Sequence, residues 1–137
     1  MIALTRRYRF AAAHVLASER LSPEENARIY GKCANPAGHG HDYALELTVA
    51  GPVDPRSGSI LPRERLDALV GERVLARFGH RMLNHDPAFR ARVPTAENIC
   101  EVIREELAPR IAEAGVRLVR VRLEETRRNS FALGELR

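Results

Sequence analysis

The 137-residue chain has few aromatic residues, no Trp, two cysteines and no long apolar run. An aromatic content of 5% disfavours a nucleic-acid surface built on stacked bases. Cys33 and Cys100 are too few for the disulfide framework of a small secreted domain. No stretch approaches the roughly 20 apolar residues that a membrane span needs, and the first residues lack a signal-peptide core. We therefore expect a cytoplasmic protein with reduced thiols and neither a membrane nor a nucleic-acid partner.

Lysine is almost absent, although basic residues outnumber acidic ones by 22 to 18. Arg supplies 21 of the 22, and Lys32 is the one exception. A genome that favours Arg codons explains this ratio, since Arg also occupies positions that share no face. The alternative is an anionic partner, because the guanidinium fork donates bidentate hydrogen bonds to phosphate.

Two stretches alternate between apolar and polar residues, as half-buried strands do. They cover residues 4–14 and, more clearly, residues 39–49. Residues 15–38 between them have no clear period, and we expect a long loop with at most a helical turn near residues 23–29. A loop of this length in a compact domain is usually functional.

The second half of the chain has two helical patterns. Apolar residues recur at helical spacing over residues 62–78 and again after Thr95, a suitable N-cap. Pro109 is expected to kink or interrupt the second helix before Gly115 ends the region.

Residues 119–125 alternate again and place Glu125 on the apolar side, and residues 130–133 form a last short strand after a turn. The order is strand, strand, helix, helix, strand, strand. This order predicts one α+β domain over residues 1–137, with a four-stranded antiparallel sheet and both helices on one face.

Three histidines converge if the first two strands pair antiparallel. His14 ends the first strand, while His39 and His41 begin the second and point to the same side. Gly40 between them removes bulk on the other side. Three neutral imidazoles suit Zn²⁺ and leave a fourth position open, as catalytic sites do, although nickel, cobalt or iron would accept the same ligands.

These residues belong to a longer set of motifs that resembles the family of 6-pyruvoyl- and 6-carboxy-tetrahydropterin synthases. The motifs span nearly the whole chain: Phe10–His14, Tyr30–Cys33, Asn35–His41, Asp54–Gly58, His80 with Leu83-Asn84, Pro94–Asn98 and Glu125-Thr126. The resemblance implies the tunnelling fold, whose subunits form trimers and hexamers with active sites at subunit interfaces. It also implies a homo-oligomer of this chain.

The resemblance implies a role for each matching residue. His14, His39 and His41 match the zinc ligands, and Cys33 and His80 match the catalytic residues. Glu125 matches the pterin anchor, and Glu97, Thr95 and Thr126 match positions around the pterin.

Some of these residues have a second interpretation from the sequence alone. Lys32 and a metal would favour the thiolate of Cys33, but Cys33 could equally be an ordinary loop thiol. Glu125 could instead pair with Arg120 or Arg122, although both point to the other face. Cys100 lies within a helix and is expected to be a packing residue.

The resemblance implies a lyase that acts on 7,8-dihydroneopterin triphosphate. One branch of the family eliminates triphosphate and gives 6-pyruvoyl-tetrahydropterin. The other branch, 6-carboxy-tetrahydropterin synthase of the queuosine and deazapurine route, releases acetaldehyde. Five residues separate Cys33 from His39, which resembles the pyruvoyl branch, whereas three is usual in the carboxy branch.

Three positions depart from the family pattern. Gly79 stands where the family has an Asp before the catalytic histidine, Pro62 where Asp or Asn is common, and Ala96 where a hydroxyl residue is common. An Asp beside the histidine would orient the imidazole and stabilise its charged form. Asp42, Asp86 or Glu124 of a neighbouring subunit could replace it. A pterin-binding paralogue with weakened activity is therefore the alternative function.

Overall fold

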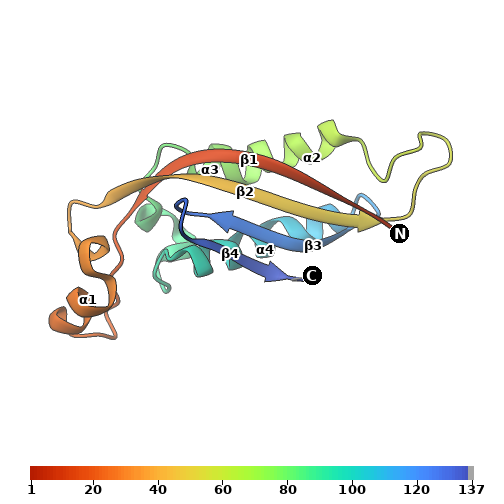
Figure 1. Ribbon diagram of the computed structural model, residues 1–137. Coiled ribbons are helices and arrows are strands. Elements are labelled where there is room, and N and C mark those ends of the chain that lie inside the picture. The colour runs from red at the N-terminus through yellow and green to blue at the C-terminus, as the bar shows by residue number, and fades with distance from the viewer. Residues whose placement is uncertain (136–137) are drawn as a thin grey trace.

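Four antiparallel strands form one sheet in the computed structural model, which describes residues 1–135 (Figure 1). The strands are β1 (Ile2–His14), β2 (His39–Gly51), β3 (Arg117–Glu124) and β4 (Ser130–Gly134), in this order across the sheet. Each pairs antiparallel with its neighbour. The predicted α+β architecture is confirmed.

The helices that cover the sheet lie on one of its faces, as the sequence predicts (Figure 1). They are α2 (Arg63–Val70), α3 (Ala76–Phe78) and α4 (Ala96–Ala112), and a π-helical turn, Gly71–Leu75, joins α2 to α3. No helix within residues 1–135 has the length and apolar character to cross a membrane.

The core fills the space between the sheet and these helices, because strand side chains alternate between this face and the open one. Its fully buried members include Tyr43, Leu45, Leu47, Val121 and Leu123 from the sheet and Val70, Val74, Phe78, Ile99, Ile103 and Leu107 from the helical layer. Cys100 also belongs to this core, and burial raises its pKa to about 12. This confirms the packing role expected for it.

The loop after β1 contains a complete helix, α1 (Pro23–Tyr30), rather than a single helical turn. Ser22 accepts a hydrogen bond from the Glu25 N–H, and the Glu25 carboxylate accepts one from the Ser22 N–H. This reciprocal capping box fixes the start of the helix. A short 3-10 turn, Gly31–Ala34, then carries Cys33 toward β2.

The expectation that Pro109 interrupts the second helix is wrong, since α4 continues to Ala112. A proline removes one backbone hydrogen bond, and here it does so only in the last turn. Leu107 and Ile111 flank Pro109 and are both buried, so the packing of this turn holds the helix together.

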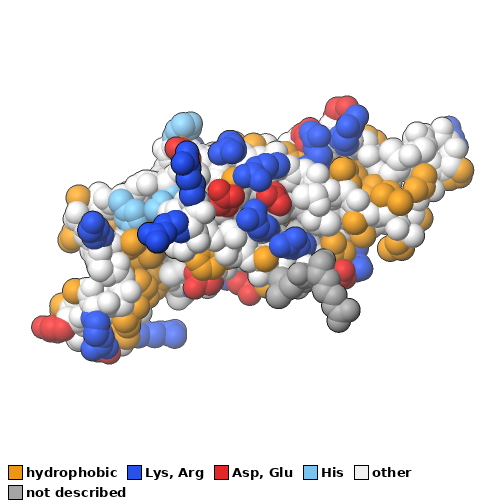
Figure 2. Space-filling view, in the orientation of Figure 1, with side chains coloured by type: hydrophobic (Ala, Val, Ile, Leu, Met, Phe, Trp, Pro, Cys, Tyr) orange, Lys and Arg blue, Asp and Glu red, His pale blue; other side chains and the backbone are white. Residues whose placement is uncertain are grey.

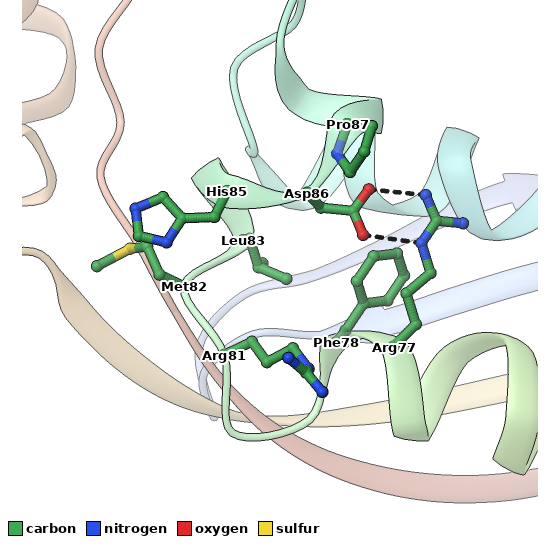
Figure 3. A pocket seen from close by; sticks show the side chains of 8 residues that line it. All are labelled: Arg77, Phe78, Arg81, Met82, Leu83, His85, Asp86 and Pro87. Atoms are coloured by element: carbon green, nitrogen blue, oxygen red, sulfur yellow. Dashed lines mark hydrogen bonds and ion pairs between the residues drawn. The ribbon is translucent and has the colours of Figure 1, made fainter.

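An ion pair braces the segment that leads from α3 to α4. The Arg77 guanidinium donates two hydrogen bonds to the Asp86 carboxylate, at 2.8 and 2.7 Å (Figure 3). Asp86 also accepts a hydrogen bond from the Ala88 N–H. The bond from Arg77 holds the pKa of Asp86 below its ordinary value.

We predict that Asp86→Asn lowers the free energy of unfolding by about 1–3 kcal/mol at neutral pH, because Arg77 loses its partner. The folded pKa of Asp86 is lowered. The contribution of the carboxylate is therefore complete above an unfolded pKa of about 3.9 and is lost as the pH falls through the folded value. Urea unfolding at pH values between about 3 and 7 should show the difference from wild type shrinking below pH about 4.

The matched control is Glu64→Gln, since Glu64 is exposed and forms no ion pair in the part of the chain that the structure describes. This variant should have the same free energy of unfolding as wild type at every pH tested. A stability difference for Asp86→Asn that stays constant down to pH about 3 would contradict the assignment.

Candidate active site

The pairing of β1 with β2 brings the three histidines together. His14 lies directly opposite His39 in the register, and His41 lies opposite Ala12. The Nε2 atoms of His14 and His39 are 3.1 Å apart, and one ring nitrogen from each of the three histidines lies within 4.8 Å of the others. The predicted convergence of His14, His39 and His41 is confirmed. A Cβ at Gly40 would make only an ordinary contact, at 3.5 Å from the Ala12 carbonyl oxygen, so the steric role expected for this glycine is not needed.

His14 is fully buried, and its orientation is fixed from outside the sheet. Its Nδ1 lies 2.8 Å from the carbonyl oxygen of Pro94, just before α4. A carbonyl can only accept, so Nδ1 carries the proton and Nε2 presents its lone pair to His39 and His41. Burial lowers the pKa of His14 to about 4, so this imidazole is neutral at pH 7.

The donor set fits a divalent metal ion. His41 Nε2 and His39 Nδ1 are buried and have no hydrogen-bond partner within residues 1–135. Buried polar atoms normally have a partner, and a metal ion supplies one for a ring nitrogen. Burial also lowers the pKa of His41 and so favours the neutral form that binds metal.

Three segments from other parts of the chain form hydrogen bonds with the end of β1 near the three histidines. The Asn84 amide accepts a hydrogen bond from the Val15 N–H at 2.8 Å and donates one to the Val15 carbonyl at 2.9 Å. The Leu16 N–H donates to the Cys33 carbonyl at 2.7 Å. The Ala13 N–H donates to the Arg81 carbonyl at 2.9 Å. The chain on both sides of His14 is thereby held in place.

Sequence reasoning did not assign a structural role to Asn84 or Pro94, although both fall in motifs. Their bonds to Val15 and His14 cross long stretches of sequence, which no periodic pattern reveals. The hydroxyl oxygen of Tyr43 lies 3.4 Å from His14 Nδ1, a contact that strand alternation does not indicate.

Cys33 and Glu125 lie in one electrostatic environment beside the triad. Burial and the Glu125 charge both raise the pKa of Cys33. Burial and the Glu97 charge in turn raise the pKa of Glu125. That Lys32 and a metal ion favour the Cys33 thiolate stays a prediction, and burial and Glu125 act in the opposite direction.

Glu125 follows β3 instead of continuing it, and its N–H donates to the Asn129 carbonyl within the hairpin turn. It still stays half-buried. The alternative ion pair does not form within residues 1–135, because Arg122 binds Glu46 and Glu124 on the open face of the sheet.

Two of the three other residues that match positions around the pterin form hydrogen bonds within the chain. Thr95 is the N-cap of α4 and accepts a hydrogen bond from the Asn98 N–H at 3.2 Å. Thr126 Oγ1 accepts hydrogen bonds from the N–H groups of Arg128 and Asn129, both at 3.1 Å, and so shapes the hairpin turn. Glu97 is exposed in the first turn of α4.

His80 lies on the outer edge of β1, where its N–H donates to the Ala11 carbonyl at 2.6 Å. Its side chain is exposed and, with His41 and Asp42, lines a hollow of about 440 Å³. The backbone of His80 is left-handed, with φ of 58°. A Cβ at the preceding Gly79 would lie 2.5 Å from the Leu75 carbonyl oxygen, so an Asp does not fit there without a backbone shift.

Fold and triad together define an α+β protein with a cluster of three histidines that could hold a metal ion. A family model described as 6-pyruvoyl tetrahydropterin synthase matches residues 3–135. The 6-pyruvoyl tetrahydrobiopterin synthase of Pongo abelii is 39% identical over 127 residues, which are 92% of this chain and 86% of that protein. The Homo sapiens protein of the same name is 38% identical over the same shares.

A solved structure gives the same result. The Caenorhabditis elegans 6-pyruvoyl tetrahydropterin synthase superposes with a TM-score of 0.90 at 36% identity and covers 98% of this chain and 95% of that chain. The chain therefore belongs to the 6-pyruvoyl tetrahydropterin synthase family, and the tunnelling fold expected from its motifs is confirmed.

We predict that Asn84→Ala weakens zinc binding roughly tenfold, because the bonds that hold the chain next to His14 are lost. Stability should fall by about 1–3 kcal/mol, since both backbone groups of Val15 lose a partner. Calorimetric titration of the metal-free protein with Zn²⁺ and urea unfolding measure the two effects.

Asn26→Ala is a matched control. Asn26 makes the same kind of amide clamp on Ser18, with bonds of 2.8 and 3.0 Å, and among the described residues its side chain has no hydrogen bond to His14 or Val15. It should cost comparable stability and leave zinc affinity unchanged. Equal zinc affinity in Asn84→Ala and wild type would overturn the positioning role of Asn84.

Proposed function

We propose that this chain is a zinc-dependent lyase that converts 7,8-dihydroneopterin triphosphate to 6-pyruvoyl-tetrahydropterin and triphosphate. The observation that carries the proposal is the convergence of the ring nitrogens of His14, His39 and His41 within 4.8 Å of one another. Relatives named 6-pyruvoyl tetrahydrobiopterin synthase, which align with 92% of the chain, support it.

His14, His39 and His41 would hold the zinc ion, which supplies a Lewis acid for the side-chain hydroxyls of the substrate. The buried His14 keeps its Nε2 lone pair available, because its Nδ1 proton is bound to the Pro94 carbonyl. The reaction is an internal rearrangement and needs no external redox cofactor.

Glu125 would anchor the pterin by accepting hydrogen bonds from the paired N–H groups of its amino-pyrimidine edge. A half-buried carboxylate with a raised pKa gains from such donors, which favour its charged form. Glu97, Thr95 and Thr126 complete the pterin surroundings in this proposal.

Cys33 and His80 would move protons at the substrate side chain as general base and acid. His80 is exposed on the β1 edge, so the proposal includes a homo-oligomer, trimer or hexamer, in which active sites form between subunits. We propose a cytoplasmic location for this assembly.

One feature favours a second candidate, a pterin-binding protein with weak turnover. Gly79 leaves His80 without an adjacent carboxylate, and the Leu75 carbonyl leaves no room for one. Asp86 and Glu124 are occupied by Arg77 and Arg122 within the described chain. Asp42 is the remaining candidate, since it lines the same hollow as His80.

Mass spectrometry of products from the zinc-loaded protein and dihydroneopterin triphosphate tests the proposal. We expect 6-pyruvoyl-tetrahydropterin and one triphosphate per turnover. Acetaldehyde with 6-carboxy-tetrahydropterin would assign the other branch. Tight binding of pterin without any product would favour the second candidate.

We predict that Cys33→Ala lowers kcat by roughly 100-fold or more while zinc content and pterin binding stay unchanged, because only a proton-transfer group is lost. Cys100→Ala is the control. It removes a thiol from the core, so stability falls by about 1 kcal/mol and kcat stays within roughly twofold of wild type. A Cys33→Ala protein with wild-type kcat would exclude the thiol from proton transfer.

A further inference from the structure

Three cationic side chains lie beside the candidate site and have no assigned role. Lys32, Arg127 and Arg128, here called the basic rim, line a hollow of about 1100 Å³ together with Thr126 and Asn129. Lys32 comes from the 3-10 turn after α1, whereas the two arginines come from the hairpin turn between β3 and β4. The fold therefore gathers them from segments far apart in the sequence.

Within residues 1–135, no carboxylate pairs with the charges of the basic rim. Lys32, Arg127 and Arg128 are exposed, and none forms an ion pair among residues 1–135. By contrast, Arg7 and Arg122 on the open face of the sheet share Glu46, with distances of 2.8 Å each. The basic rim is thus available to an anionic ligand.

The rim adjoins the candidate active site through the chain itself. Lys32 precedes Cys33, and Arg127 and Arg128 follow Glu125 by two and three residues. Figure 2 shows blue side chains on both sides of the pale blue histidine patch at this end of the sheet. The site therefore has the half-buried carboxylate of Glu125 inside it and exposed cations at its edge.

The backbone that presents the two arginines is held in one conformation. Thr126 Oγ1 accepts hydrogen bonds from the Arg128 and Asn129 N–H groups, and the Glu125 N–H donates to the Asn129 carbonyl. Glu125, Thr126, Arg128 and Asn129 are thus bonded to each other around Arg127. An ordered turn lowers the entropy lost when its side chains bind a ligand.

We propose that the basic rim binds the triphosphate tail of the substrate while the carboxylate interior receives the pterin head. This assignment rests on the proposed function for the identity of the head group. Two guanidinium forks and one ammonium suit a chain of phosphates, since Arg binds phosphate oxygens bidentately and Lys acts as a point charge. The separation of charge within the site would fix which end of the ligand enters first.

The test compares an Arg127→Gln/Arg128→Gln protein with an Arg56→Gln/Arg65→Gln control, which removes the same charge. Arg56 and Arg65 are exposed, form no ion pair among the described residues, and lie in and after the turn that follows β2. Inorganic triphosphate is titrated calorimetrically into each full-length protein, kept metal-free with a chelator so that metal chelation adds no heat. KM and kcat are measured separately on the zinc-loaded proteins.

We expect the rim variant to bind inorganic triphosphate roughly tenfold more weakly or worse, since charge-assisted bonds to phosphate are lost. KM for dihydroneopterin triphosphate should rise by a similar factor, with kcat within roughly twofold. The affinity for dihydroneopterin, which lacks phosphate, should not change. The control should match wild type throughout.

Equal binding of inorganic triphosphate by wild type and rim variant, or an equal loss in the control, would overturn the proposal. If wild type turns over the substrate and the rim variant keeps its KM, the rim assignment fails while the proposed function stands. A third outcome is that none of the proteins turns over the substrate and only the rim variant binds inorganic triphosphate more weakly. In that case the anion site stands while the proposed function fails.

Discussion

The register of β1 against β2 is the constraint on which the rest of the site depends. It sets His14 opposite His39 and places His41 on the same face. A slip of one residue would turn every side chain of one strand to the other face and separate the ligands. Tyr43 and Leu45, fully buried one and two steps further along the same face, make such a slip costly. The core that stabilises the sheet therefore also fixes the metal ligands.

The site is completed by segments that no strand contains. The loop with Cys33, the turn with Asn84 and the residue before α4, Pro94, each bond to β1 or to the chain that leaves it. A small domain encloses little space within one core, so the site at the end of the sheet is built from segments that meet near the surface. Burial therefore favours the neutral form of every group it shifts inside the site, lowering the pKa of His14 and His41 and raising that of Cys33 and Glu125, while Lys32, Arg127 and Arg128 remain exposed.

Much of this could be predicted from the sequence, and the limits are physical. Alternation with period two located the first three strands, the turn after residue 126 indicated the fourth, and antiparallel pairing then brought the triad together without reference to any relative. The clamps of Asn84 and Pro94 were not predictable, because a side chain bonded to a distant backbone leaves no periodic pattern. The predicted interruption at Pro109 failed for a related reason. Burial of Leu107 and Ile111 stabilises the helix by more than the loss of one backbone hydrogen bond destabilises it. The position of Glu125 beyond β3 depends on turn bonds that alternation does not encode.

The departure at Gly79 follows from how the chain leaves α3. The next residues must reach the outer edge of β1, where the His80 N–H and the Arg81 carbonyl bond to Ala11 and Ala13. This path brings residue 79 against the Leu75 carbonyl and forces His80 into a left-handed backbone. Histidine tolerates that conformation better than bulkier residues, and only glycine has no Cβ to meet the carbonyl. An Asp at this position would therefore need a local backbone shift, and within the described residues the carboxylate that lines the same hollow as His80 is that of Asp42.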